Sequence, residues 1–370
     1  MMKKVYYIER DPFTSRAFFP VFSEDELSGS EGTERLEKGY RQAEPNGVAL
    51  NTAFCDIASR YDSFRAMLNK PKKRLNVVGL GDVGGTVVTA LKLLGDFVSE
   101  IGVYDPNEAL CRRYEMELNQ VLGHDEPRIK VIGEDELFDC EAFLFTASRG
   151  VPPIGAVGDM RMLQFEKNRD MLKFYTKKAR DSHFTGIFCQ ISDPVDQLSR
   201  CVFLQSNRDE KGEYDFRGLL PEQVAGFGLG VMRARAGYMA KRMGIYTDSI
   251  RAYGPHGADL VIANSTAEYD EEISEELTRM TVGANMEVRA LGFKPYIAPA
   301  LSSAALSILS MLRGEYFHGA IPMEGVYFGC VSRLTEMGSV VRAESIHPKL
   351  MARIFDTWNK LREAENTCRL

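Results

Sequence analysis

Three glycines are spaced as in a turn that binds the pyrophosphate of a dinucleotide. The turn, residues 79–84, follows the apolar run 75–78 and precedes a segment with apolar residues at helical spacing. Gly79 allows a tight turn, Gly81 lets the backbone approach a pyrophosphate, and Gly84 lets the helix pack closely on the strand. Free N–H groups at the start of the helix can then bind the anion.

A carboxylate follows the glycine turn at the spacing expected for a residue that binds the adenosine ribose. Asp105 ends a second apolar run, 100–104, and lies 21 residues after Gly84. From there a carboxylate can accept hydrogen bonds from the ribose hydroxyls, and it repels a 2′-phosphate. The pattern therefore predicts NAD as the cofactor rather than NADP. The alternative is a glycine turn in an α/β protein that binds no dinucleotide.

Length and composition set limits on the class of protein. A chain of 370 residues can bury a large core and suggests about two domains. Its 44% hydrophobic and 26% charged residues are typical of a soluble globular protein. A net charge of -6 argues against a nucleic-acid partner. No stretch approaches 18 consecutive apolar residues, so we expect no membrane partner.

The N-terminus and the cysteines indicate the compartment. The first apolar segment is too short for a signal peptide. The seven cysteines are scattered and include no C-x-x-C pair. We therefore expect a cytoplasmic location, reduced thiols and no metal site.

Strands and helices alternate from residue 74 to about residue 206. This alternation predicts a doubly wound parallel sheet with helices on both faces and ligands at the carboxyl ends of its strands. After the second strand we expect strands over 128–132, 142–146 and 185–191, and helices over 107–122 and 162–181.

In the second half of the chain, longer helical segments are mixed with short strand-like ones. We interpret this half as a substrate domain. The spacing predicts helices over 224–243, 271–291, 299–313 and 348–362, strand-like runs over 249–253 and 260–264, and two strands within 325–341.

Residues 1–73 precede the nucleotide fold as an extension. We expect a short strand over 5–8, a flexible loop over 23–46 and a helix over 47–69. Aromatic side chains before the loop need a surface to bury against, so the extension is expected to dock on the main body or on a neighbouring subunit. A packing arm is favoured over a gating or regulatory segment. The predicted domains are therefore 1–73, 74–221 (cofactor binding) and 222–370 (substrate and catalysis).

Six short stretches, in order, resemble the lactate and malate dehydrogenase family over residues 74 to about 345. They are the glycine turn with 115–119 after it, Phe145-Thr146-Ala147-Ser148, Arg161 with Asn168 seven residues later, Ser192-Asp193-Pro194-Val195-Asp196, Gly226-Phe227-Gly228 through Arg235, and Tyr253-Gly254-Pro255-His256-Gly257. The resemblance implies an α/β fold, with a Rossmann doubly wound parallel sheet and an α+β substrate domain. The cofactor-binding residues that it and the glycine turn together imply are Gly79, Gly81, Asp82, Val83, Gly84, Asp105, Thr146 and Ala147.

The resemblance also implies catalytic roles. His256 would exchange a proton with the substrate, because imidazole titrates near neutral pH. Arg235 would bind the substrate carboxylate with its planar fork. Arg161, carried on a mobile loop, would close over the substrate and polarise its carbonyl. The alternatives are a histidine that only shapes a turn and an arginine paired to an acid.

The loop before Arg161 and a later helix would complete the substrate pocket. Residues 148–160 contain glycines and prolines that suit a lid. Its nearest candidates for the position that sets specificity are Arg149 and Val151. The helix with Leu301, Ser302 and Ser303 would place small side chains near the substrate's R group.

Two departures from the family stand at the site. Met232 replaces the aspartate that orients and charges the histidine, so the protonated imidazole loses a stabilising carboxylate. Asp193 replaces the family's asparagine. We hypothesise that Asp193 is a catalytic residue that pairs with His256 and compensates. The opposing interpretation is that Asp193 repels an anionic substrate and that the site is inactive.

The sequence therefore predicts an NAD-dependent oxidoreductase that interconverts a small 2-hydroxy acid and its 2-oxo acid. The alternative is a catalytically impaired NAD-binding sensor or scaffold protein. The metal-dependent glycosidases that share the fold are disfavoured, because no cysteine and histidine are placed as metal ligands. A homodimer or homotetramer is implied by the resemblance, with 231–242 and 271–291 as candidate interface helices.

Overall fold

The computed structural model describes residues 5–13, 16–23, 33–41, 45–123, 125–148, 160–246, 248–257 and 259–367. The strands are β1 (Val5–Glu9), β2 (Phe18–Val21), β3 (Gly47–Asn51), β4 (Lys73–Val78), β5 (Val98–Tyr104), β6 (Arg128–Val131), β7 (Ala142–Phe145), β8 (Ile187–Gln190), β9 (Val224–Gly226), β10 (Arg251–Tyr253), β11 (Val261–Ala263), β12 (Phe317–Met323), β13 (Val326–Thr335) and β14 (Gly338–Val341). The helices are α1 (Thr33–Arg41), α2 (Ile57–Leu68), α3 (Asp82–Leu94), α4 (Glu108–Leu118), α5 (Met160–Asp181), α6 (Val195–Ser206), α7 (Leu229–Arg242), α8 (Glu271–Ala290), α9 (Leu306–Leu312) and α10 (Pro348–Thr367).

A nine-stranded sheet organises the described residues, in the order β14-β13-β12-β9-β8-β7-β4-β5-β6. The strands from β6 to β9 are parallel, and β12, β13 and β14 continue antiparallel. The strand order reverses between β4 and β7, and the carboxyl ends at such a switch point form the ligand crevice of this architecture. The predicted α/β fold with a Rossmann sheet is confirmed.

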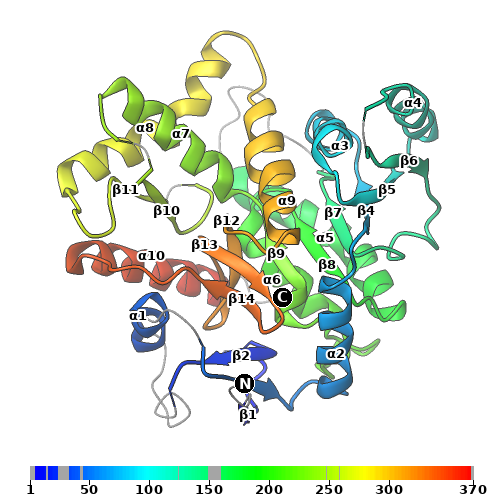
Figure 1. Cartoon of the computed structure of the whole chain (residues 1–370), viewed down its shortest axis with the longest axis horizontal. Helices are drawn as coiled ribbons and strands as arrows, with labels where there is room; N and C mark the ends of the chain where they lie inside the picture. Colours follow the sequence, from blue (N-terminus) through cyan, green and yellow to red (C-terminus); the bar gives the residue numbers. More distant parts are fainter. Residues whose placement is uncertain are drawn as a thin grey trace.

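The sheet continues across the predicted domain boundary at residues 221 and 222. Strand β9 lies just after this boundary and pairs with β8 on one side and β12 on the other. Figure 1 shows α3, α4, β5 and β6 together on one side of the molecule and α7, α8, β10 and β11 on the other. The division into a cofactor domain and a substrate domain stays a prediction.

The predicted helix over 224–243 was wrong at its start. Its first residues form β9, which is buried between two neighbouring strands, and α7 begins only at Leu229. Three further elements were not predicted, namely β2, α6 and β12. The predicted helix over 299–313 exists, but its first part, Pro299–Ala305, is a π-helical segment.

The N-terminal extension is more ordered than expected. The predicted loop over 23–46 contains α1, although residues 24–32 and 42–44 lie outside the described ones. The predicted helix over 47–69 was partly wrong, because residues 47–51 form the middle strand of a small β1-β3-β2 sheet and only α2 is helical. Pairing with two neighbouring strands overrides the local helical pattern.

The extension packs on the main body through buried polar contacts, as expected for a packing arm. A carboxylate oxygen of Glu222 accepts a hydrogen bond from the backbone N–H of Ala17 at 2.8 Å. Arg16 is half-buried and donates to the carbonyl oxygen of Ser339 at 2.9 Å. Burial raises the pKa of Glu222 to about 7, and the Arg16 guanidinium opposes this shift.

None of the described helices is both long and apolar enough to cross a membrane.

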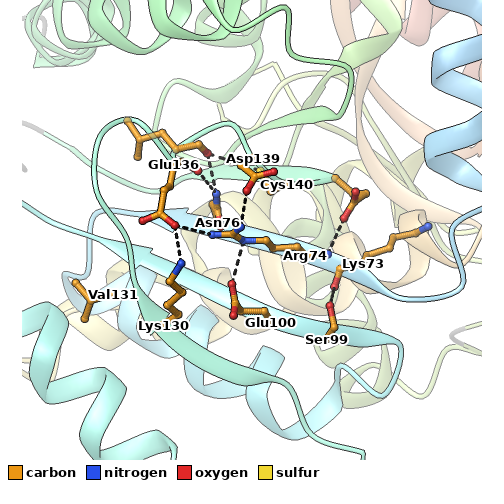
Figure 2. A network of polar contacts seen from close by, with 12 residues as sticks. Lys73, Arg74, Asn76, Ser99, Glu100, Lys130, Val131, Glu136, Asp139 and Cys140 are labelled. Atoms are coloured by element: carbon orange, nitrogen blue, oxygen red, sulfur yellow. Dashed lines mark hydrogen bonds and ion pairs between the residues drawn. The ribbon is translucent and has the colours of Figure 1, made fainter.

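A polar network ties the amino end of β4 to its neighbours, away from the carboxyl ends (Figure 2). The guanidinium of Arg74 reaches Asp139 at 2.7 Å and Glu100 on β5 at 3.1 Å. The buried amide of Asn76 donates to the carbonyl oxygens of Glu136 and Leu137 at 2.9 Å. The network therefore fixes the loop before β7 against the centre of the sheet.

We expect Arg74→Met to lower the free energy of unfolding by about 2 kcal/mol, because it removes the cation beside the partly buried carboxylates of Glu100 and Glu136. The matched control is Arg113→Met, which removes an exposed ion pair with Glu117 on α4. It should cost less than about 0.5 kcal/mol. Urea unfolding of both variants measures the difference, and equal losses would contradict a structural function of the network.

Candidate active site

The glycine turn lies between the carboxyl end of β4 and the start of α3. Gly79 has φ +90, and a Cβ there would lie 2.6 Å from the backbone of Ala147. A Cβ on Gly84 would lie 1.8 Å from the carbonyl oxygen of Gly79, whereas a Cβ on Gly81 would meet nothing within 4 Å. Two glycines thus serve the packing of the turn, and the third faces open space beside the uncapped N-terminus of α3. Such a place suits a pyrophosphate.

Neighbouring strand ends hold this turn in place. One carboxylate oxygen of Asp105 accepts from the backbone N–H of Leu80 at 2.8 Å, and the other accepts from that of Asn107 at 2.9 Å. The hydroxyl of Thr146 lies 2.6 Å from the carbonyl oxygen of Gly79. Asp105 therefore positions the turn, a function that its spacing alone did not reveal.

A cavity of about 400 Å³ brings together three of the predicted site residues. Its walls come from α7, α8 and α10 and from the loops that follow β8 and β10. Asp193, Arg235 and His256 all line it, as does Met232. Its size falls in the range of ligand pockets.

The imidazole of His256 is held by a backbone carbonyl. Its Nδ1 lies 2.8 Å from the carbonyl oxygen of Gly228. A carbonyl oxygen can only accept, so Nδ1 carries the proton and Nε2 is free to exchange one with a ligand. A Cβ at position 228 would lie 2.8 Å from the Cβ of His256, so only glycine allows this approach.

The same carbonyl oxygen accepts a second hydrogen bond. The hydroxyl of Ser303 donates to it at 2.8 Å and itself accepts from the backbone N–H of Val231 at 2.8 Å. Ser303 is buried. The expectation that Ser303 lines the substrate pocket was therefore wrong. Leu301 and Ser302 are not among the residues around the cavity either, where Pro299 stands instead.

Asp193 lies on the other side of the imidazole. Its Oδ1 is 4.0 Å from Nε2 of His256, within reach of an ion pair when the ring is protonated. Its backbone carbonyl oxygen accepts from the amide of Asn168 on α5 at 2.8 Å, and the peptide bond to Pro194 is cis. The geometry is compatible with the hypothesis that Asp193 pairs with His256.

Arg235 projects from α7 into the cavity. Burial lowers the pKa of its guanidinium, and the nearby Asp193 carboxylate opposes this shift. Among the described residues no carboxylate forms an ion pair with it, and its Nη1 makes a weak contact with the sulfur of Met232 at 3.8 Å. The guanidinium can therefore take an anionic ligand.

Other predicted site residues fall partly or wholly outside the description. Arg161 lies in the first turn of α5, but its side chain lies outside the described part. Arg149 and Val151 also lie outside it. Within the described residues no group of three or more histidine, cysteine or acidic side chains could hold a metal ion.

A buried carboxyl group forms a hydrogen bond with the backbone of His256. A carboxylate oxygen of Asp196 accepts from the backbone N–H of His256 at 3.1 Å. Burial raises the pKa of Asp196 to about 7. The sequence stretch around Asp193 contained this residue, but a local motif could not show that its side chain is buried.

We expect Asp196→Asn to reduce the pH dependence of stability. The folded-state pKa of Asp196 lies above its unfolded value of about 3.9, so its stabilising contribution is full below about pH 4 and is lost as the pH rises through about 7. Between pH 5 and pH 7 the wild type should lose about 2 kcal/mol more than the variant, whose amide does not ionise. Urea unfolding at both pH values measures this.

The control is Asp62→Asn, which changes an exposed carboxyl on α2. It should follow the wild type. A wild type and Asp196→Asn variant with parallel pH profiles would show that Asp196 is not held protonated by the fold.

Known proteins of similar sequence are dehydrogenases. No family model matches the chain. L-lactate dehydrogenase 2 of Staphylococcus aureus (strain JH9) is 28% identical over 299 residues, which cover 72% of this chain and 88% of that protein.

Solved structures of similar fold include lactate and malate dehydrogenases. The minor L-lactate dehydrogenase from Enterococcus mundtii, in a ligand-bound form, superposes with a TM-score of 0.67 at 20% identity and covers 81% of this chain and 100% of that one. The malate dehydrogenase from Archaeoglobus fulgidus in complex with NADH gives 0.66 at 21% identity, with 80% and 99% covered.

Proposed function

Since the chain belongs to the lactate and malate dehydrogenase family, we propose that it is an NAD-dependent oxidoreductase that interconverts a small 2-hydroxy acid and its 2-oxo acid. The observation that carries this proposal is the free Nε2 of His256, which faces a cavity that also holds the Arg235 guanidinium. A proton donor and a carboxylate-binding cation are the groups that such a reaction needs from the protein.

Each side chain has a separate task in this proposal. Arg235 binds the substrate carboxylate through two parallel hydrogen bonds. His256 gives a proton from Nε2 to the oxo group during reduction and takes it back during oxidation. Asp193 stabilises the protonated imidazole from 4.0 Å. Arg161 polarises the carbonyl.

The glycine turn is proposed to hold NAD. When bound, NAD would supply a hydride to the 2-oxo carbon or take one from the 2-hydroxy carbon. The N–H groups at the start of α3, beside the open space at Gly81, would hold its pyrophosphate. Asp105 still has lone pairs for the ribose hydroxyls after its two backbone contacts, and its charge disfavours a 2′-phosphate.

The same proposal extends to the domains and to the assembly of the protein. Residues 74–221 bind the cofactor and residues 222–370 the substrate. Helices α7 and α8 carry exposed Tyr238 and Met286, which suits contact with a second copy in a cytoplasmic homodimer or homotetramer. The mass in sedimentation is the test of assembly.

An inactive NAD-binding sensor is the second candidate. The observation in its favour is the half-exposed Asp193 carboxylate, which shares the cavity with Arg235 and can repel an anionic substrate.

We expect Gly81→Ala to weaken NADH binding alone and Gly84→Ala to lower both NADH binding and stability. The methyl group of Gly81→Ala occupies the open space beside α3, so NADH affinity should fall by at least about tenfold with little change in stability. The methyl group of Gly84→Ala collides with backbone and should lower both affinity and stability. NADH fluorescence titration and urea unfolding separate the effects. Unchanged NADH affinity in Gly81→Ala would remove the proposed pyrophosphate site.

We expect the wild type to oxidise NADH with at least one acid from a panel of pyruvate, oxaloacetate and branched and aromatic 2-oxo acids. His256→Gln removes the proton donor and should lower kcat by about 1,000-fold. Asp193→Asn should lower kcat by about tenfold and shift the loss of activity with rising pH to lower pH, because the imidazolium loses its carboxylate. Steady-state rates from pH 5 to 9 measure both.

Two results would count against these assignments. NADH binding without reduction of any acid would favour the sensor. An Asp193→Asn variant with the rate and pH profile of the wild type would sink the pairing of Asp193 with His256.

A further inference from the structure

The cavity around His256 has a wall that the proposed chemistry leaves unused. Val282, Asn285 and Arg289 line it from α8, at spacings of three and four residues that place them on one helix face. The carboxylate-binding Arg235 comes from a different helix, α7.

Arg289 is half-buried, and its guanidinium makes no hydrogen bond or ion pair with any residue in the described ranges. Two other cations, Arg279 and Lys360, have acidic partners. On the same helix, Arg279 bonds Glu276 at 2.8 Å. Across the cavity, Lys360 on α10 pairs with Asp356 at 2.7 Å and approaches Asp259 at 4.0 Å. Arg289 therefore brings to the wall of the cavity a guanidinium whose hydrogen-bond donors have no partner in the described ranges.

The surface at the junction of the two helices is apolar. Met232 on α7 is buried in a cluster with residues of α8, and Val282 packs against the same cluster. Both side chains line the cavity. Apolar wall of this kind suits methylene groups better than water.

The space is also larger than a three-carbon acid needs. A water molecule takes about 30 Å³ in the liquid, so a cavity of about 400 Å³ holds on the order of a dozen waters. A ligand with two negatively charged ends and an apolar middle would fill a cavity of this size. Its ends could bind the two arginines, and its middle could contact the apolar wall.

We propose that Arg289, assisted by the amide of Asn285, binds an acidic group at the far end of the substrate, so that the preferred substrate is a 2-oxo diacid of five or more carbons. This inference rests on the proposed function, since it assigns the substrate of the same site. Arg235 holds the carboxylate next to the oxo group, and the planar fork of Arg289 holds the distal one. Arg289 is thus a specificity residue and takes no part in proton transfer.

The test compares 2-oxo acids of equal length with NADH as the reductant. The pairs are 2-oxoglutarate with 2-oxovalerate and 2-oxoadipate with 2-oxohexanoate, with oxaloacetate as the shorter diacid. For the wild type, kcat/KM should be at least tenfold higher for the diacid of each pair, and higher for 2-oxoglutarate than for oxaloacetate.

Arg289→Met should lower the ratio of kcat/KM for diacid to monoacid at least tenfold, mainly through a higher KM for the diacid. Arg289→Lys should recover part of the ratio, because it keeps the charge without the fork. The matched control, Arg279→Met, removes an arginine from the same helix that bonds Glu276, and should keep the wild-type ratio.

The outcomes separate the two proposals. A wild type that reduces monoacids and diacids equally, or a ratio unaffected by Arg289→Met, overturns the assignment of Arg289 and leaves the dehydrogenase intact. A wild type that reduces no acid of the series overturns the proposed function, and the assignment of Arg289 falls with it.

Discussion

The carbonyl oxygen of Gly228 is the point on which the candidate site depends. It accepts from Nδ1 of His256 and from the hydroxyl of Ser303, both at 2.8 Å, and so uses both of its lone pairs. These contacts join the start of α7, the turn after β10 and the π-helical segment before α9. Glycine at position 228 is required, because any side chain there would collide with the imidazole. The position of the ring and of its proton follows from this one acceptor.

A carbonyl acceptor and a carboxylate acceptor differ in what they give a histidine. Both orient the ring, but only the carboxylate adds negative charge that favours the imidazolium. In this chain the two tasks are divided: the Gly228 carbonyl orients Nδ1, and Asp193 brings charge to the Nε2 side. The cost is that Asp193 also faces Arg235, so a substrate carboxylate meets both an attractive and a repulsive group in one cavity.

Local sequence pattern was enough to predict the parallel strands β4 to β8 and the glycine turn, because apolar runs and glycine spacing mark these elements directly in the sequence. The local pattern failed at β9 and β3. These segments have the apolar spacing of a helix, but they form strands because they pair with strands distant in the sequence. His256 and Arg235, which line one cavity, were predicted as site residues through a family resemblance. The hydrogen bond from His256 to Gly228 was not, because its acceptor is a backbone atom whose only trace in the sequence is the glycine. The prediction that Ser303 lines the substrate pocket failed for a related reason. A small side chain is found both in pocket walls and at buried hydrogen bonds, so its size does not distinguish the two.

The most direct test of this arrangement is the tautomer of His256. Nitrogen-15 NMR of histidine-labelled protein above pH 8, with the His256→Gln variant to assign the signal, reports which ring nitrogen carries the proton in the neutral form. A protonated Nδ1 and an unprotonated Nε2 are expected, because a carbonyl oxygen can only accept. A proton on Nε2, or a mixture of the two tautomers, would contradict the orienting function of Gly228 and, with it, the division of tasks between that carbonyl and Asp193.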